Sequence, residues 1–154
     1  MCASFLQRGG LWVVVQFALM IAVIALGMGL RGSGWGWPAS AVGIAFFLLG
    51  GVFGIAGVVV LGRNRTPFPQ PRVNSELIQR GIYARVRHPL YTSVMLISLG
   101  WALLWQSWPA LLVALALIPF FHAKARREER WLAEKFSGYA DYAKRVPRFL
   151  PRFG

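Results

Sequence analysis

The sequence predicts an all-α integral membrane protein that forms a single domain over residues 1–154. We expect four transmembrane helices, the last two paired as a helical hairpin, followed by a cytoplasmic C-terminal amphipathic helix. Three observations lead to this fold class. Apolar residues make up 56% of the chain, the mean hydropathy is +0.52, and the apolar residues form long uncharged blocks. Because lipid offers no hydrogen-bond partners, such blocks cross a bilayer as helices, for which about 20 apolar residues suffice.

The first two blocks, residues 11–30 and 38–62, are each long enough for one crossing. The first block could alternatively be a secretory signal with Arg8 as its basic flank. However, it is longer than the usual apolar region of a signal, and a second span follows at once, so we expect it to stay in the membrane. Both blocks carry small residues at helical spacing, which predicts packing seams; these residues are Ala18, Ala22, Ala25, Gly29, Gly50, Gly54 and Gly57.

The third block, residues 90–121, is too long for a single crossing, since one helix of this length would measure about 48 Å. It is interrupted near Ser107, which is suited to cap a helix, and Pro109, which is suited to a first helical turn. The sequence therefore predicts two spans, 89–105 and 108–125. Pro119 lies inside the second of these and should kink it.

Two further segments are predicted outside the spans. Three prolines between residues 67 and 71 favour an extended loop, which either covers a ligand or is a plain linker. Ser75 then marks a short helical turn near residues 76–79 that should stop at Gly81. After the last span, aromatic and basic residues between 131 and 142 predict an amphipathic helix along the membrane surface, ended by Pro147.

The distribution of charge predicts the orientation of the chain. Its formal net charge is +12, which would indicate nucleic acid in a soluble protein. With four crossings, however, sixteen of the seventeen Lys and Arg residues fall on one side, and only Arg31 lies on the other. The positive-inside rule then places both termini in the cytoplasm. We expect this basic surface to attract anionic lipid headgroups, and no nucleic acid.

Two polar clusters, residues 81–91 and 126–129, flank the predicted hairpin and should meet at one membrane face. Polar side chains beside a bilayer are costly unless they pair or bind a ligand. A simpler alternative is that Arg87 and His88 are interfacial anchors within an aromatic belt. Glu128 and Glu129 are adjacent, so on a helix they point in different directions and do not form a carboxylate dyad. Cys2 is the only cysteine, which excludes an internal disulfide, and we expect no metal site.

Residues 62–151 resemble the isoprenylcysteine carboxyl methyltransferase family, a broad group that includes phospholipid methyltransferases. The match consists of G-x-Y-x-x-x-R-H-P-x-Y from Gly81, then the hydrophobic hairpin, then E-E-x-x-L-x-x-x-F and Y-x-x-Y-x-x-x-V-P. The resemblance implies that S-adenosyl-L-methionine binds at the cytoplasmic face. The cofactor-binding residues that it implies, in segments 75–91 and 124–147, are Ser75, Glu76, Leu77, Ile78, Tyr83, His88, Pro89, Leu90, Tyr91 and Glu128.

The candidate catalytic residues are Lys124, Arg127 and Glu129. Lys124 stands where the isoprenylcysteine enzymes have an arginine that engages the substrate carboxylate. Lysine keeps the charge but lacks the bidentate fork of arginine, and Arg127 lies near enough in sequence to substitute.

The resulting hypothesis is a membrane methyltransferase that acts on a lipophilic substrate from the bilayer. A prenylcysteine-like carboxylate is the favoured acceptor, with a phospholipid amine or a small thiol as alternatives. A non-catalytic membrane or lipid-binding module would explain the basic and aromatic residues, but not the order of His, Pro, Tyr and Glu. A relative of the sterol reductases would need more spans than this chain has.

Overall fold

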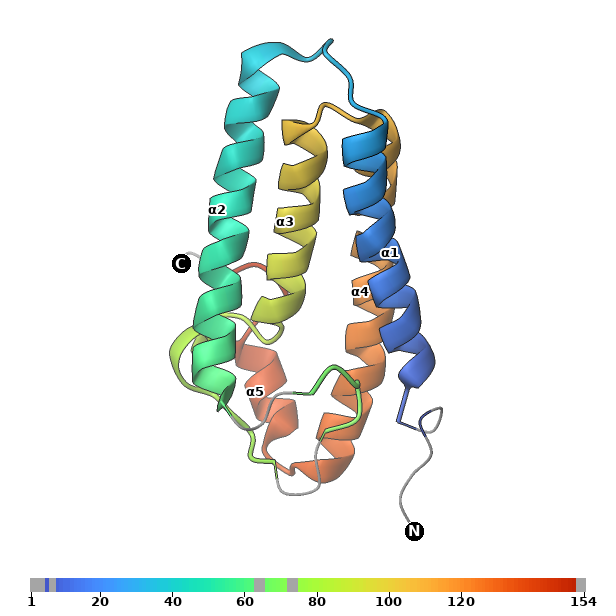
Figure 1. The fold of residues 1–154 in the computed structure, drawn as a ribbon. Helices are drawn as coiled ribbons and strands as arrows, with labels where there is room; N and C mark the ends of the chain where they lie inside the picture. The colour runs from blue at the N-terminus through green and yellow to red at the C-terminus, as the bar shows by residue number, and fades with distance from the viewer. Residues whose placement is uncertain (1–4, 6–7, 63–65, 72–74, 152–154) are drawn as a thin grey trace.

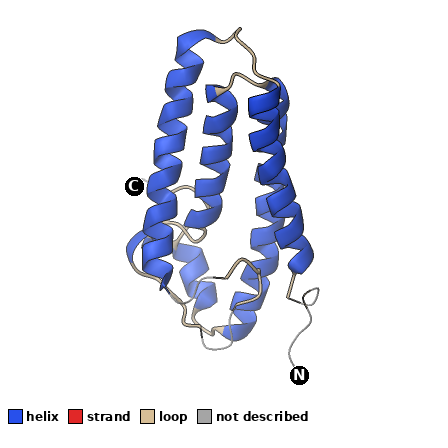
Figure 2. Ribbon diagram, in the orientation of Figure 1, coloured by secondary structure: helices blue, strands red, loops and turns tan. Residues whose placement is uncertain are grey.

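The structure is a computed structural model that describes residues 5, 8–62, 66–71 and 75–151, and all regular secondary structure in these ranges is helical (Figure 2). The elements are α1 (Gly10–Gly29), α2 (Gly36–Leu61), the 3₁₀ helix η2 (Gly81–Ala84), α3 (Pro89–Leu104), α4 (Trp108–Lys135) and α5 (Tyr139–Arg145). In the described part of the chain, α1, α2 and α4 are long and apolar enough to cross a membrane, and α3 is a shorter apolar helix of 16 residues. The predicted all-α membrane fold is confirmed, whereas the number of crossings stays a prediction.

The four longer helices run side by side, with α3 packed against α1, α2 and α4 (Figure 1). The short helix α5 and the loops around it gather at one end of the bundle, at the C-terminal end of α4. This arrangement brings the segment before α3 next to the last turns of α4, as the predicted hairpin requires.

The turn between α3 and α4 forms where Ser107 and Pro109 predicted it. Ser107 caps α4 by accepting a hydrogen bond from the Ala110 amide at 3.4 Å, and its hydroxyl donates to the Leu26 carbonyl of α1 at 3.1 Å. Pro109 occupies the first turn, where its missing N–H costs nothing. Helix α4 continues through Pro119 to Lys135, well beyond residue 125, so Glu128 and Glu129 lie on a continuous helix.

The glycine seam predicted on the second span packs α2 closely onto α3. A Cβ atom added to Gly50 would lie 2.7 Å from Ile97 and 2.9 Å from the Ser93 carbonyl, and Gly54 and Gly57 face α3 in the same way. The Ser93 hydroxyl donates a 2.6 Å hydrogen bond to the Gly50 carbonyl. The seam predicted on the first span was wrong in part: Ala18, Ala25 and Gly29 are exposed. Helix α1 instead buries Val23 and Gly27, because a different face of this helix packs against α3 and α4.

The structure corrects two predictions for the loops and the C-terminal region. No helical turn forms over residues 75–79. The 3₁₀ helix instead begins at Gly81, where the sequence predicted that a helical turn would end. The predicted amphipathic helix is divided at residues 136–138, and its aromatic face packs inward, burying Tyr139, Tyr142 and Val146. Tyr142 finds an internal acceptor, since its hydroxyl donates to the Tyr83 carbonyl at 2.6 Å. Burial raises the pKa of Tyr142 to about 12, which keeps this donor protonated.

The seam can be tested with two neighbouring glycines of α2. We expect Gly50→Ala to destabilise the protein by about 1–3 kcal/mol, because the added methyl group overpacks the α2–α3 contact. Gly51→Ala is the matched control, since a Cβ there would meet nothing within 4 Å. Thermal unfolding in detergent measures both, and equal unfolding temperatures for the two variants would contradict the seam.

Candidate functional site

A cavity opens at the end of the bundle where α3 begins. It encloses about 790 Å³, counted out to its open mouth. Nine of the ten cofactor residues implied by the sequence resemblance line it, and Pro89 is buried beside them at the start of α3. The full lining consists of Leu61, Thr66, Ser75, Glu76, Leu77, Ile78, Tyr83, Arg87, His88, Leu90, Tyr91, Glu128, Leu132, Phe136, Tyr139 and Tyr142.

Glu128 presents its carboxylate to this cavity and is held there by Tyr91. The Tyr91 hydroxyl donates to Glu128 Oε2 at 2.6 Å. The Tyr91 ring lies parallel to the His88 imidazole, with ring centroids 5.2 Å apart, and His88 Nδ1 lies 3.7 Å from the same carboxylate oxygen. Because a bond to a charged acceptor is stronger than a neutral one, these contacts fix the position of Glu128.

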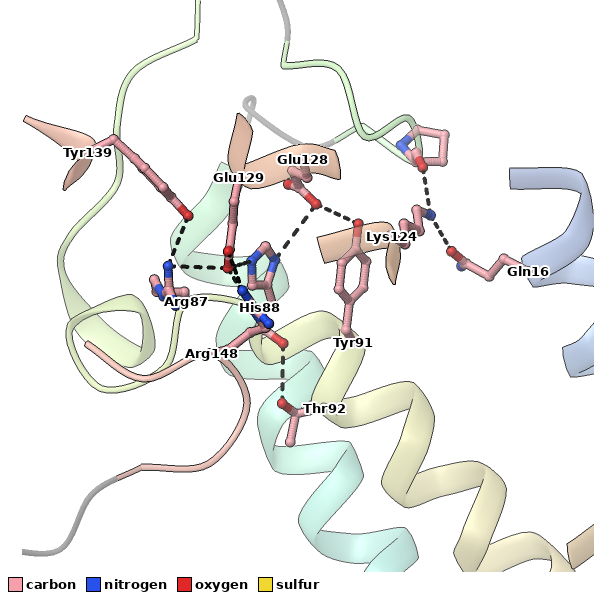
Figure 3. A network of polar contacts seen from close by, with 11 residues as sticks. Gln16, Arg87, His88, Tyr91, Thr92, Lys124, Glu128, Glu129, Tyr139 and Arg148 are labelled. Atoms are coloured by element: carbon pink, nitrogen blue, oxygen red, sulfur yellow. Dashed lines mark hydrogen bonds and ion pairs between the residues drawn. The ribbon is translucent and has the colours of Figure 1, made fainter. Parts of the chain in front are cut away.

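Glu129 is not among the cavity-lining residues and points into an ion-pair cluster (Figure 3). Its two oxygens accept bonds from Arg148 at 2.9 and 2.6 Å, and Oε1 also contacts Arg87 Nη1 at 3.2 Å and His88 Nε2 at 3.0 Å. The carboxylate is 12% exposed. It raises the pKa of Arg148 above its usual value. Glu129 is therefore engaged with Arg87, His88 and Arg148, and its catalytic role stays a prediction.

His88 lies between the two glutamates (Figure 3). Its Nε2 atom lies 3.0 Å from Glu129 Oε1, and its Nδ1 atom lies 3.7 Å from Glu128 Oε2. The imidazole is 5% exposed. Its orientation is therefore determined on one side by the ion-pair cluster, and on the other it completes the wall of the cavity.

A C-terminal strap, residues 147–149, is hydrogen-bonded to the start of α3 and to the residues before it. The Pro147 carbonyl accepts a hydrogen bond from the Arg87 backbone N–H, and the Arg148 carbonyl accepts one from the His88 backbone N–H, both at 3.0 Å. The Phe149 carbonyl accepts a 2.8 Å bond from the Thr92 hydroxyl. Arg148 was not among the residues predicted for the site, although it directly follows the V-P pair of the motif.

The other two candidate catalytic residues lie outside the cavity lining. Lys124 is buried, with 1% exposure, and its ammonium donates to the side-chain carbonyl of Gln16 in α1 and to the Pro67 carbonyl. It lies 5.2 Å from the centre of the Tyr91 ring. Arg127 is exposed and stacks over Trp131 at 4.9 Å. Gln16 was missed by the sequence analysis, although it is an isolated polar residue inside the first apolar block.

Removing the charge of Glu129 tests the ion-pair cluster. We expect Glu129→Gln to lower the free energy of unfolding by about 2 kcal/mol, because Arg87 and Arg148 would keep partly buried charges without a counter-ion. Glu134→Gln, at an exposed position of the same helix, is the control and should change little. Denaturant unfolding in detergent, with limited proteolysis of the strap, measures the effect. Similar stability of the two variants would show that the cluster does not hold the strap.

Comparisons with known proteins agree with the motif. Residues 38–138 match the phospholipid methyltransferase family. The chain is 33% identical over 148 residues to the cobalt-zinc-cadmium resistance protein CzcN of Cupriavidus metallidurans, which covers 95% of this chain and 64% of that protein. It is 32% identical over 155 residues to the nickel-cobalt-cadmium resistance protein NccN of Alcaligenes xylosoxydans xylosoxydans, covering 97% and 68%.

Protein-S-isoprenylcysteine O-methyltransferase B of Arabidopsis thaliana is 29% identical over 119 residues, which cover 75% of this chain and 60% of that protein. The chain thus spans about two thirds of the length of the curated relatives it matches, or less. With a family match over residues 38–138, and with relatives at this level of identity, the chain belongs to the phospholipid methyltransferase family of membrane proteins, the broad group that includes the isoprenylcysteine methyltransferases.

Proposed function

We propose that this protein is an S-adenosylmethionine-dependent methyltransferase that acts on a lipophilic substrate. One observation carries the proposal: nine of the ten residues implied for the cofactor line one cavity, around a carboxylate held by Tyr91. These residues come from three separate stretches of the chain. A non-catalytic lipid-binding module would not require them to converge.

The residues around the cavity fit the chemistry of this cofactor. Apolar and aromatic walls such as Leu77 and Phe136 suit an adenine ring, and Glu128 suits ribose hydroxyls or an amino group. The rings of Tyr83 and Tyr91 suit a positively charged sulfonium centre. When bound, the cofactor would supply an electrophilic methyl group. The protein would then act mainly by orienting the acceptor and excluding water.

The acceptor that we favour is a carboxylate on an apolar chain, as in a prenylcysteine. Support comes from the isoprenylcysteine methyltransferase relative and from the buried cation Lys124, which lies beside Tyr91. The accepting nitrogen of a phospholipid amine would not pair with this charge, and a small thiol would do so only as its thiolate. Two relatives are named for metal resistance, but among the described residues no group of three His, Cys, Asp or Glu side chains could hold a metal ion.

We also propose that the chain crosses the membrane four times, with both termini and the cavity on the cytoplasmic side. Helix α3 is shorter than the other spans but lies among them. The exposed arginines near the end of α4, Arg126, Arg127 and Arg130, would then face anionic lipid headgroups, as the positive-inside rule expects.

Cofactor binding can be measured by titrating S-adenosylhomocysteine into detergent-purified protein in a calorimeter. We expect saturable binding that Glu128→Gln weakens about tenfold or more, because hydrogen bonds to a charged acceptor are lost. The control is Glu134→Gln, which removes one negative charge in the same way but at an exposed position. Absence of binding to the unmodified protein at millimolar ligand would rule out the proposal. Transfer of a labelled methyl group into prenylcysteine, phospholipid and thiol panels would then identify the acceptor.

A further inference from the structure

We propose that the proline segment, residues 66–71, is a removable cover over Lys124, and that an acceptor carboxylate binds this lysine by taking the place of the Pro67 carbonyl. The proposal rests on the proposed function, because it assigns the carboxylate to the methyl acceptor. It adds a step that the cavity alone does not predict. Part of the connection between α2 and η2 must move before the charged end of the acceptor is paired.

The ammonium of Lys124 is buried without a counter-ion. None of the ion pairs among the described residues includes it. Its hydrogen bonds go to two neutral oxygens, the side-chain carbonyl of Gln16 and the backbone carbonyl of Pro67, whereas an ammonium has three N–H donors. Glu128, one turn further along α4, is held by Tyr91 instead. A buried charge is costly unless an opposite charge pairs with it, so Lys124 has a place for an anion.

Lys124 is a neighbour of the cavity but does not line it. Thr66 lines the cavity, and Pro67, the next residue, accepts a hydrogen bond from the ammonium at 3.2 Å. The ammonium also lies 5.2 Å from the centre of the ring of Tyr91, which is another lining residue (Figure 3). Displacement of the segment at Thr66 and Pro67 would therefore open a route from the cavity to the ammonium.

Side chains rather than backbone bonds hold the proline segment in place. Among the described residues, no backbone–backbone hydrogen bond joins it to another element, and its prolines have no N–H to donate. The Phe68 ring instead meets the Phe5 ring edge-on at 5.6 Å, with the Arg8 guanidinium 4.3 Å from its centre. Pro69 is buried, and a Cβ on Gly9 would lie 3.1 Å from it. A few contacts of modest strength thus dock the segment onto the residues that precede α1.

The proposed step exchanges one oxygen for another and changes no covalent bond. With the segment docked, the Pro67 carbonyl accepts a hydrogen bond from Lys124. With an acceptor bound, a carboxylate oxygen accepts this bond instead, and water solvates the freed carbonyl, since Pro67 is exposed. A hydrogen bond between two charged groups is stronger than one to a neutral oxygen. The segment therefore covers the cation until an anionic acceptor arrives.

Chemical modification of Lys124 tests the cover. We expect Phe68→Ala to raise acylation of Lys124 by a water-soluble amine-reactive ester about tenfold, because loss of such ring contacts shifts a local opening by this order. Lys144, which is exposed, serves as the internal standard in peptide mass spectrometry. Phe47→Ala is the matched control, because this ring lies exposed in the middle of α2.

Hydrogen exchange over α3 separates local opening from unfolding, since its amides should stay protected in Phe68→Ala. Acylation of Lys124 that is equal in the two variants would overturn the cover. So would acylation that rises only together with exchange over α3.

Two probes of one chain length test the exchange of oxygens. In Phe68→Ala, dodecanoate should slow the acylation of Lys124 about tenfold and dodecanol should not, because only the carboxylate pairs with the ammonium. Lys124→Met, which keeps the length of the side chain, should weaken dodecanoate binding in a calorimeter and leave dodecanol binding unchanged. Equal protection of Lys124 by the two probes would contradict the exchange.

Calorimetry with S-adenosylhomocysteine on the same samples separates this proposal from the proposed function. Opening in Phe68→Ala with selective protection by dodecanoate, but without cofactor binding, would refute the methyltransferase role and leave an anion site beneath the segment. Cofactor binding in a protein whose Lys124 shows neither response would overturn the cover alone.

Discussion

The carboxylate of Glu129 is the contact on which the candidate site depends. It joins three segments that are distant in sequence: the residues before α3, the last turns of α4 and the strap after α5. Removal of charges from water is costly, and a buried pair is tolerated only when its hydrogen bonds are satisfied. Here two arginines and a histidine share one carboxylate. The backbone carbonyls of the strap also accept hydrogen bonds from the backbone N–H groups of Arg87 and His88. With Glu129 engaged in this way, its neighbour Glu128 remains directed to the cavity.

Helix α3 packs differently against α2 and against α1. The glycines of α2 bring its backbone against α3, and interfaces of small residues are favoured in membranes because helices can then approach each other. Helix α1 instead packs on α4 and α3 through larger side chains, among them Val23. The contact of α3 with α2 is therefore made at the level of the backbone, whereas its contact with α1 includes larger side chains.

Hydropathy and cap residues were sufficient to predict the four longer helices and the turn at Ser107, because these depend on local physics. The convergence of Tyr83, His88 and Glu128 on one cavity also followed from the motif order. Three features required tertiary information. The inward face of α5 depends on acceptors such as the Tyr83 carbonyl, the exposure of Ala18 depends on which stripe of α1 packs, and the partners of Lys124 come from α1 and the Pro67 loop. A sequence pattern does not specify partners across more than 50 residues.

The strap has a consequence for the biosynthesis of the protein. The amides of Arg87 and His88 receive their acceptors from residues 147 and 148, which a ribosome makes about sixty residues later. Chains fold broadly in the order of synthesis, so α1, α2 and α3 are made while the polar segment before α3 still lacks its final partners. During this interval water must solvate Arg87 and His88. The cavity is then completed as a late step, after α4 supplies Glu129 and residues 147 and 148 bind the segment before α3, so translation order separates the synthesis of the first three helices from assembly of the site.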